Sequence, residues 1–301
     1  MDALTIGGAT VAVSTPTGVG PWSVERLQRL FWRAGGSPVL DLAIVPHNPR
    51  PAQEGELCFD SGIGWQAMET TRGWSFYFWG NHRLRGRTLH HVLTVDRSWR
   101  AGTFCIPETP RSATPRPFPV GYPVEQLLFV GLLAHAAGAV VHATGIIHGG
   151  RGWVFAGPHG AGKSTLAALF RRRRDMTLLN DDRVILRSLH GQWRLFGTPW
   201  PGTIQQVSTA SAPLAGICLI RHGTSTEAQP LAPSQAVARL LARCIHPYWD
   251  RQGLEALLGT IARLVQEVPC YDFPFVPHAP TILAALDTLA ASGRECNDPR
   301  G

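Results

Sequence analysis

A nine-residue stretch at 157–165 constrains this chain more than any other part of its sequence. It reads Gly-Pro-His-Gly-Ala-Gly-Lys-Ser-Thr and directly follows an apolar run at 153–156. The stretch matches G-x-x-x-x-G-K-[ST], the pattern of nucleotide-binding phosphate loops, which requires a strand before the loop and a helix after it. The sequence therefore predicts a strand over 153–156, a helix over 165–172 and an α/β fold around them.

Each position of this loop has a chemical task. The glycines let successive backbone N–H groups turn inward toward a phosphate, and the positive end of the following helix adds to their attraction. Lys163 can reach the β- and γ-phosphates as a mobile charge, and Ser164 offers a hydroxyl to Mg²⁺. The predicted nucleotide-binding residues are Gly157, Pro158, His159, Gly160, Ala161, Gly162, Lys163, Ser164 and Thr165. The alternative, a glycine-rich turn that matches by accident, is far less frequent.

The position of the single lysine supports this assignment and also indicates which nucleotide the loop binds. Of 28 basic residues 27 are arginine, and Lys163 is the single lysine. A GTPase would need a second lysine in its guanine-reading N-K-x-D stretch, and a eukaryotic-type protein kinase would need one on a separate strand. Elimination therefore favours ATP.

Two adjacent carboxylates follow the predicted helix. A short strand predicted over 176–179 runs into Asn180, Asp181, Asp182 and Arg183. Carboxylates at the end of a strand can divide the work of phosphoryl transfer, one on the metal and one as general base for an acceptor hydroxyl. A solvated turn is the alternative, because Asn-Asp-Asp is also good turn chemistry. We assign Asp181 with Ser164 to Mg²⁺ and Asp182 to the base, although the sequence alone does not separate the two neighbours.

Histidines and the remaining pattern are less specific. His142 ends an apolar strand predicted within 139–147, and His148 lies near the next turn. A lone histidine is more often packed or on the surface than catalytic. Further helices are predicted over 124–138, 233–244, 253–266 and 280–291, and a strand over 214–220.

The first hundred residues have a different character. Apolar and aromatic runs at 4–13, 39–45, 74–79 and 88–95 predict strands, and one helix is expected over 23–33 with Ser23 as its cap. Six prolines within 106–123 predict an extended connector. We therefore expect a β-rich domain over 1–105, a linker over 106–123 and a nucleotide-binding domain over 124–301.

Composition excludes several classes of protein. The formal net charge of +7 is spread thinly along the chain, which indicates acidic ligands in general and no nucleic-acid partner. No apolar run is long enough to span a bilayer, and the N-terminus lacks the features of a signal peptide. Six widely spaced cysteines fit neither a zinc site nor a compact disulfide framework. We expect a cytoplasmic protein with no membrane contact; a homo-oligomer is compatible with the sequence.

The motifs at 141–145, 154–165 and 179–184 resemble the kinase domain of the HPr kinase/phosphorylase family. The specific part of this resemblance covers about 140–187, and a looser likeness runs to about 292. It implies a PEP-carboxykinase-like phosphate-loop kinase domain, here preceded by a smaller β-rich α+β domain. It also implies ATP and Mg²⁺ as cofactors, and it places Asp181 and Asp182 at the metal and the base and His142 near the phosphates.

The chain looks closest to the HPr-kinase-like proteins associated with modified-peptide biosynthesis, some of which phosphorylate a peptide serine. The leading hypothesis is therefore an ATP- and Mg²⁺-dependent kinase that acts on a serine hydroxyl of a peptide or small protein. A kinase of a small metabolite such as free serine is the first alternative. A nucleotide-binding regulatory subunit with little turnover is the second, although the intact Lys163, Ser164, Asp181 and Asp182 argue against it.

Overall fold

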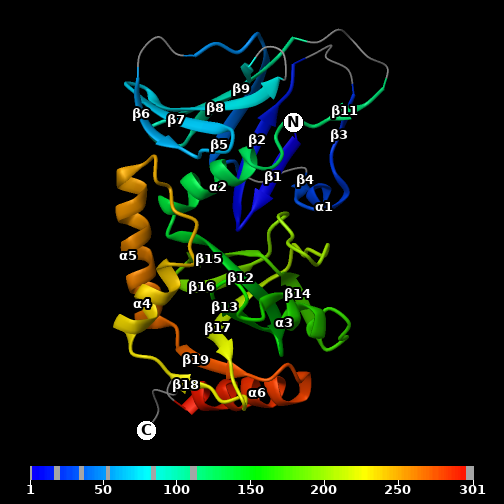
Figure 1. Cartoon of the computed structure of the whole chain (residues 1–301), viewed down its shortest axis with the longest axis vertical. Helices are drawn as coiled ribbons and strands as arrows, with labels where there is room; N and C mark the ends of the chain where they lie inside the picture. The colour runs from blue at the N-terminus through cyan, green and yellow to red at the C-terminus, as the bar shows by residue number, and fades with distance from the viewer. Residues whose placement is uncertain are drawn as a thin grey trace. The chain divides into compact units, whose positions relative to one another are not determined.

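The computed structural model describes residues 2–16, 21–33, 37–51, 55–82, 86–108 and 114–295. The chain divides into two compact units, whose elements are labelled in Figure 1. The first comprises Met1–Leu132 with Pro247–Leu254, and the second comprises Leu133–His246 with Glu255–Gly301. The division lies after 132 rather than at the predicted boundary after 123. The return of 247–254 to the first unit is a long-range contact that no local sequence pattern reports.

A nine-stranded sheet forms the first unit. Its strand order is β4 (Trp32–Arg33), β1 (Asp2–Ile6), β2 (Ala9–Ser14), β5 (Leu40–Pro46), β10 (Ala101–Ile106), β9 (Gly86–Asp96), β8 (Gly73–His82), β7 (Trp65–Thr70) and β6 (Glu56–Asp60). β5 pairs in parallel with β2 and β10, and the other neighbours are antiparallel. The predicted β-rich character of this region is confirmed.

Strand register gives the two faces of this sheet opposite chemistry. Directly paired positions on β8, β9 and β10 carry Phe76, Leu93 and Phe104, all fully buried. The next paired positions carry Ser75, Thr94 and Thr103, which point to the other face because side chains alternate along a strand. At these positions one face of the sheet is therefore apolar and buried, and the other carries a row of three hydroxyl groups.

The helix expected over 23–33 is wrong for most of its length. Only α1 (Arg26–Arg29) is helical, while β3 (Trp22–Ser23) and β4 flank it. β3 pairs with β11 (Arg116–Pro117), and the Ser23 hydroxyl donates to the Arg116 carbonyl instead of capping the helix. The segment is instead held at its start by pairing with the proline-rich segment some ninety residues away and at its end by pairing of β4 with β1. Residues 109–113 of the expected linker lie outside the described residues.

The second unit contains strands that bend from one sheet into another. They are β12 (Gly138–His148), β13 (Arg151–Ala156), β14 (Met176–Asn180), β15 (Arg183–Leu189), β16 (Gln192–Phe196), β17 (Ser211–His222), β18 (Gln229–Pro230) and β19 (Cys270–Phe275). β12 pairs with β15 through its first half and with β13 and β14 through its second. Since β17 pairs with both β16 and β13, strands β13, β12, β15, β16 and β17 form a closed ring.

Helices pack on this unit around two cores. One core includes Ala236 and Leu240 of α4 (Pro233–Leu241) and Leu257 and Ile261 of α5 (Arg251–Glu267). The other includes side chains of α3 (Lys163–Phe170) and α6 (Ala279–Glu295). The predicted helices thus exist, with ends shifted by up to four residues. α2 (Val124–Ala134) ends before the predicted 138, because Ala137 adopts a positive φ of 51° and β12 starts at Gly138. The mixed α/β class expected from the sequence is confirmed.

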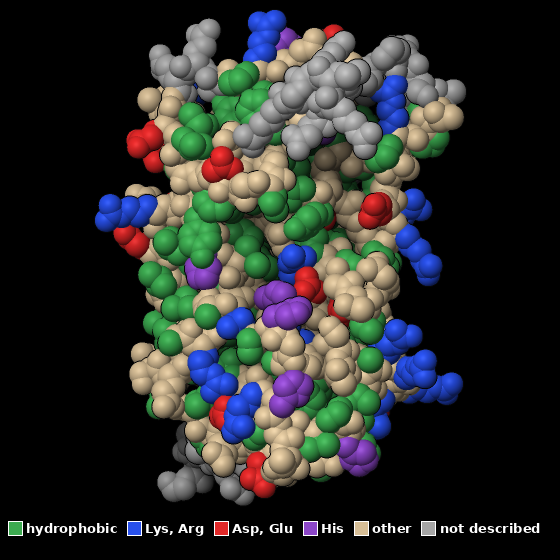
Figure 2. Space-filling view, viewed as in Figure 1, with side chains coloured by type: hydrophobic (Ala, Val, Ile, Leu, Met, Phe, Trp, Pro, Cys, Tyr) green, Lys and Arg blue, Asp and Glu red, His purple; other side chains and the backbone are tan. Residues whose placement is uncertain are grey.

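The surface agrees with the composition. Figure 2 shows the described lysine and arginine side chains in several separate groups on the face drawn, rather than in one continuous stripe. None of the helices in the described part of the chain has the length and apolar content that crossing a membrane requires.

Candidate active site

The loop at 157–162 connects β13 to α3, in the strand–loop–helix order that the motif predicts. Gly162 precedes the helix with φ 98°, a left-handed conformation that favours glycine. A Cβ atom at this position would lie 2.6 Å from the ring of Phe275, the last residue of β19. The tight turn before α3 therefore requires glycine for both backbone conformation and space, and it leaves the N–H groups of the first helical turn without intrahelical partners.

Lys163 folds back over this loop. Its Nζ donates to the carbonyls of Gly157 at 2.8 Å and Pro158 at 3.0 Å, and the residue is only 9% exposed. Burial lowers the lysine pKa, and the nearby Arg243 lowers it further, whereas Asp182 raises it. Positive charge is thus concentrated where the motif places phosphate.

A cavity of about 350 Å³ opens against the loop and the start of α3. Ser164 and Thr165 in the first turn of the helix line it, and both are exposed. The remaining lining residues are His142, His159, Gly160, Gly162, Lys163, Asp181, Asp182, Gly202 and Thr203. The structure therefore gathers most of the sequence-predicted site residues around one space; Gly157, Pro158 and Ala161 shape the loop without lining the cavity.

Asn180 organises the acidic turn. Its Oδ1 accepts the backbone N–H groups of Asp182 at 2.8 Å and Arg183 at 3.0 Å. Its Nδ2 donates to the carbonyl and hydroxyl oxygens of Thr198, and the residue is fully buried. The turn chemistry expected of Asn-Asp-Asp is real, but it belongs mainly to Asn180, which leaves the two carboxylates for other contacts.

Asp181 holds a second loop in place. Its Oδ1 accepts the backbone N–H of Gly202 and its Oδ2 accepts that of Ile204, both at 2.8 Å. The residue is 3% exposed, although it still lines the cavity. Thr144 on β12 ties the same turn to the helix, since its hydroxyl contacts the carbonyls of both Asp181 and Lys163. The predicted metal role of Asp181 therefore coexists with a structural one, because each of its oxygens has one lone pair already engaged.

Asp182 contacts His142, and both residues line the cavity. The His142 Nε2 lies 3.3 Å from Asp182 Oδ1, and the Arg183 guanidinium lies 2.9 Å from Oδ2. Burial lowers the pKa of His142, opposed by Asp182 and assisted by the positive charges of Lys163, Arg183 and Arg243. These effects favour a neutral imidazole.

Two residues near the site were not found by sequence reasoning. Arg243 follows α4, and its carbonyl accepts the His142 backbone N–H at 2.7 Å. His222 ends β17, and its Nε2 lies 2.7 Å from the Gly160 carbonyl at the tip of the phosphate loop. Because a carbonyl can only accept, this contact places the imidazole proton on Nε2. Both residues lie at least 60 positions from the loop in sequence, so only strand pairing reveals them.

The donors at this cavity suit a Mg²⁺ ion accompanied by phosphate. Within the described ranges, no group of three or more histidine, cysteine, aspartate and glutamate side chains could enclose a metal. Mg²⁺ in nucleotide sites is usually held by one or two carboxylates together with substrate phosphates and water. Ser164, Asp181 and Asp182 supply donors of that kind around one cavity, so these residues fit the ion.

Comparison with known proteins adds little to this picture. No protein-family model matches the chain, and no curated protein matches it. Among solved structures, the chain is similar to the HPr(Ser) kinase/phosphatase from Coxiella burnetii, at 14% identity and a TM-score of 0.28. The match covers 52% of this chain and 90% of that one. A likeness of this size carries no functional argument, and the site's own geometry has to supply it.

Proposed function

We propose that this protein is an ATP- and Mg²⁺-dependent kinase that transfers the γ-phosphate to a serine hydroxyl of a peptide or small protein. The observation that carries the proposal is the arrangement at one cavity. A phosphate loop with its buried Lys163 and exposed Ser164 lies on one side, and the Asp182–His142 pair lies on the other. Phosphoryl transfer requires little beyond positioning and charge neutralisation, which these groups are suited to provide.

Asp182 is the proposed general base. In the transfer, a bond forms between the acceptor oxygen and the γ-phosphorus while the bond from that phosphorus to the β,γ-bridging oxygen breaks. The hydroxyl proton passes to Asp182, and ADP leaves. Asp182 is more accessible than Asp181, because its carboxylate accepts no backbone N–H from the described residues and its side chain is partly exposed. That accessibility is the reason for assigning it the proton.

Lys163 and His142 complete the charge balance. Lys163 would move from the carbonyls of Gly157 and Pro158 to the phosphates, exchanging neutral acceptors for charged ones, which form stronger hydrogen bonds. His142, kept neutral by burial and by the surrounding cations, can position Asp182 without neutralising it. When bound, Mg²⁺ would be held by Ser164 and the outer lone pairs of the acidic turn and would neutralise developing phosphate charge.

The test is transfer itself. Purified protein is incubated with γ-labelled ATP, Mg²⁺ and serine-containing peptides, with free serine as a parallel acceptor. Label on the peptide serine is the expected result, lost in Lys163→Ala and Asp182→Asn. Label on free serine alone would establish the metabolite kinase instead. ATP binding without transfer to any acceptor would contradict the kinase proposal.

A further inference from the structure

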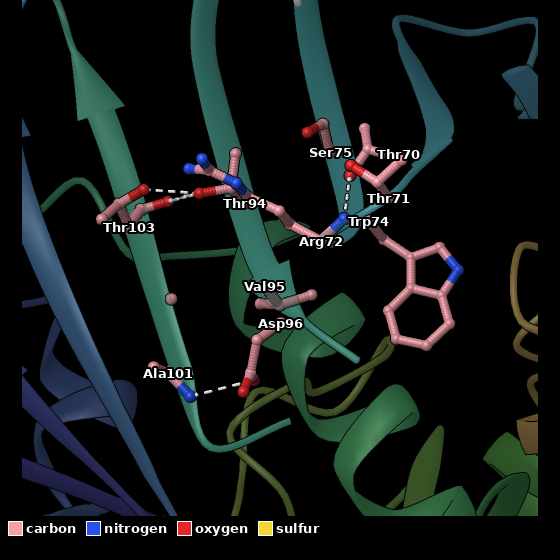
Figure 3. Close-up of a pocket in the computed structure, with 11 residues that line it drawn as sticks. Thr70, Thr71, Arg72, Trp74, Ser75, Thr94, Val95, Asp96, Ala101 and Thr103 are labelled. Atoms are coloured by element: carbon pink, nitrogen blue, oxygen red, sulfur yellow. Dashed lines mark hydrogen bonds between the residues drawn. The ribbon is translucent and has the colours of Figure 1, made fainter. Parts of the chain in front are cut away.

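The first unit contains a separate cavity of about 920 Å³ on the hydroxyl-lined face of its sheet, shown in Figure 3. It extends over the ends of β8, β9 and β10 and the turn that joins β7 to β8. Its volume is near the upper end of the range for small-molecule sites, about 300–1,000 Å³. We call this space the hydroxyl trough and define it by Arg72, Ser75, Thr94 and Thr103.

The central row of residues on the floor of the hydroxyl trough is uncharged. Ser75, Thr94 and Thr103 occupy directly paired positions on three neighbouring strands. Their small side chains leave the space above the sheet open, where arginine or glutamate would fill it. The hydroxyls of Thr94 and Thr103 bond to one another, as the dashed lines in Figure 3 show.

Ser75 differs from its two neighbours. It is only 5% exposed, and none of the hydrogen bonds among the residues that the structure describes engages its hydroxyl. In Figure 3 its oxygen points from β8 toward β9, into the trough. This hydroxyl can therefore donate to or accept from a ligand in the trough without breaking a bond within the protein.

A cation reaches into the same space. The turn at Thr70 fixes the backbone of Arg72, whose N–H donates to the Thr70 hydroxyl, and the Arg72 side chain extends along the trough toward Thr94 (Figure 3). Its guanidinium forms no ion pair within the described ranges, whereas the neighbouring Arg97 pairs with Glu69 at 3.0 Å.

Asp96, the one carboxylate lining the trough, does not compete for Arg72. Its Oδ1 accepts the backbone N–H groups of Arg100 and Ala101, and its Oδ2 accepts the Ser98 hydroxyl. Among the described residues, the trough therefore presents a guanidinium without an ion pair and a hydroxyl without a hydrogen bond. An arginine and a hydroxyl in this combination favour an oxyanion, to which guanidinium binds strongly.

We propose that the hydroxyl trough binds a carboxylate-bearing segment of a peptide, with the carboxylate on Arg72 and a backbone amide on Ser75. This assignment rests on the proposed function, which requires the protein to hold a peptide or small protein. The net charge of +7 favours an acidic partner, and a trough that crosses three strands suits an extended chain. The peptide would thus be recognised by residues outside the phosphate-loop site.

The test measures peptide binding without ATP. The probe is a fluorescein-labelled decapeptide of glycine and serine that contains three aspartates, with the same peptide carrying asparagines as its matched control. Wild-type protein is expected to bind the aspartate peptide at least about tenfold more tightly, since a hydrogen bond to a charged group contributes about 1.5–3 kcal/mol. Arg72→Gln should abolish that preference, and Arg100→Gln, also an exposed arginine of this unit, should keep it.

Ser75→Ala separates binding from folding. Because the hydroxyl forms no hydrogen bond with the described residues, its removal should leave the melting temperature unchanged while it weakens binding of both peptides several-fold. Equal affinity of wild type, Arg72→Gln and Ser75→Ala for the aspartate peptide would overturn the proposal, as would equal binding of the two peptides. Lys163→Ala must leave peptide affinity unchanged. Loss of the trough with phosphate transfer intact would therefore leave the proposed kinase function standing.

Discussion

The phosphate-loop site and the hydroxyl trough are assembled from the chain in two different ways. Most of the first comes from one continuous stretch, because the nine residues at 157–165 supply the loop, the lysine and the hydroxyl that we propose binds the metal. The second takes Ser75, Thr94 and Thr103 from three strands that only pairing brings together. A site of the first kind can be identified from sequence, whereas one of the second kind becomes visible only with the register.

If the phosphate-loop site performs the reaction and the hydroxyl trough only binds peptide, substitutions in or beside the 157–165 stretch should lower turnover most. Asp182→Asn should lower turnover by about 10²–10⁴-fold, the usual contribution of a general base, while ATP affinity is retained. Turnover and Mg·ATP affinity are measured together. Asp175→Asn, which changes an exposed aspartate paired with Arg173, is the matched control and should behave as wild type. Near-wild-type turnover in Asp182→Asn would reduce the acidic turn to a structural element.

Removal of the single lysine should separate the loop from the rest of the site. Lys163→Ala is expected to lower turnover by about 10²–10³-fold, comparable to loss of one charge-stabilising donor. It should also remove the stabilisation by ATP, which reaches about 2.7 kcal/mol at a hundred times Kd and raises the melting temperature of wild type by several degrees. Arg172→Ala, on the exposed end beyond α3, is the control. An ATP-dependent shift that persists in Lys163→Ala would contradict the phosphate-loop assignment.

Features that depend on neighbouring residues were predicted from the sequence, and features that depend on long-range pairing were not. The strand before the loop, the helix after it and the acidic turn were predicted because each depends on neighbouring residues. The prediction of a helix over 23–33 was wrong because Ser23 pairs with β11 at one end and Trp32–Arg33 pairs with β1 at the other, and no local pattern carries that information. His222 and Arg243 were missed for the same reason, since each reaches the site from the end of a distant strand or helix.

Asp181 combines features of both kinds of site. It lies in the acidic turn that the sequence identifies, but its carboxylate binds the backbone of a distant loop. Asp181→Asn should destabilise the second unit by about 1–3 kcal/mol, since an amide can accept only one of the N–H groups of Gly202 and Ile204 and turns a donor toward the other. The free energy of unfolding and Mg·ATP affinity are measured on the same variant. Weaker Mg²⁺-dependent binding with normal stability would assign Asp181 to the metal alone.

The smallest expected effect concerns His222 at the end of β17, and it tests whether this residue helps the phosphate loop to bind ATP. His222 donates from Nε2 to the Gly160 carbonyl, so His222→Ala should release the loop tip and raise KM for ATP by a few-fold, equivalent to about 0.5–1 kcal/mol, with kcat little changed. His222→Gln offers an amide donor in place of the imidazole and should restore most of the affinity. A merely structural residue would not show this rescue together with a KM-specific effect. If both variants bind ATP as wild type does, the loop holds its phosphate-binding form without help from β17, and the division between continuous and register-built sites is complete.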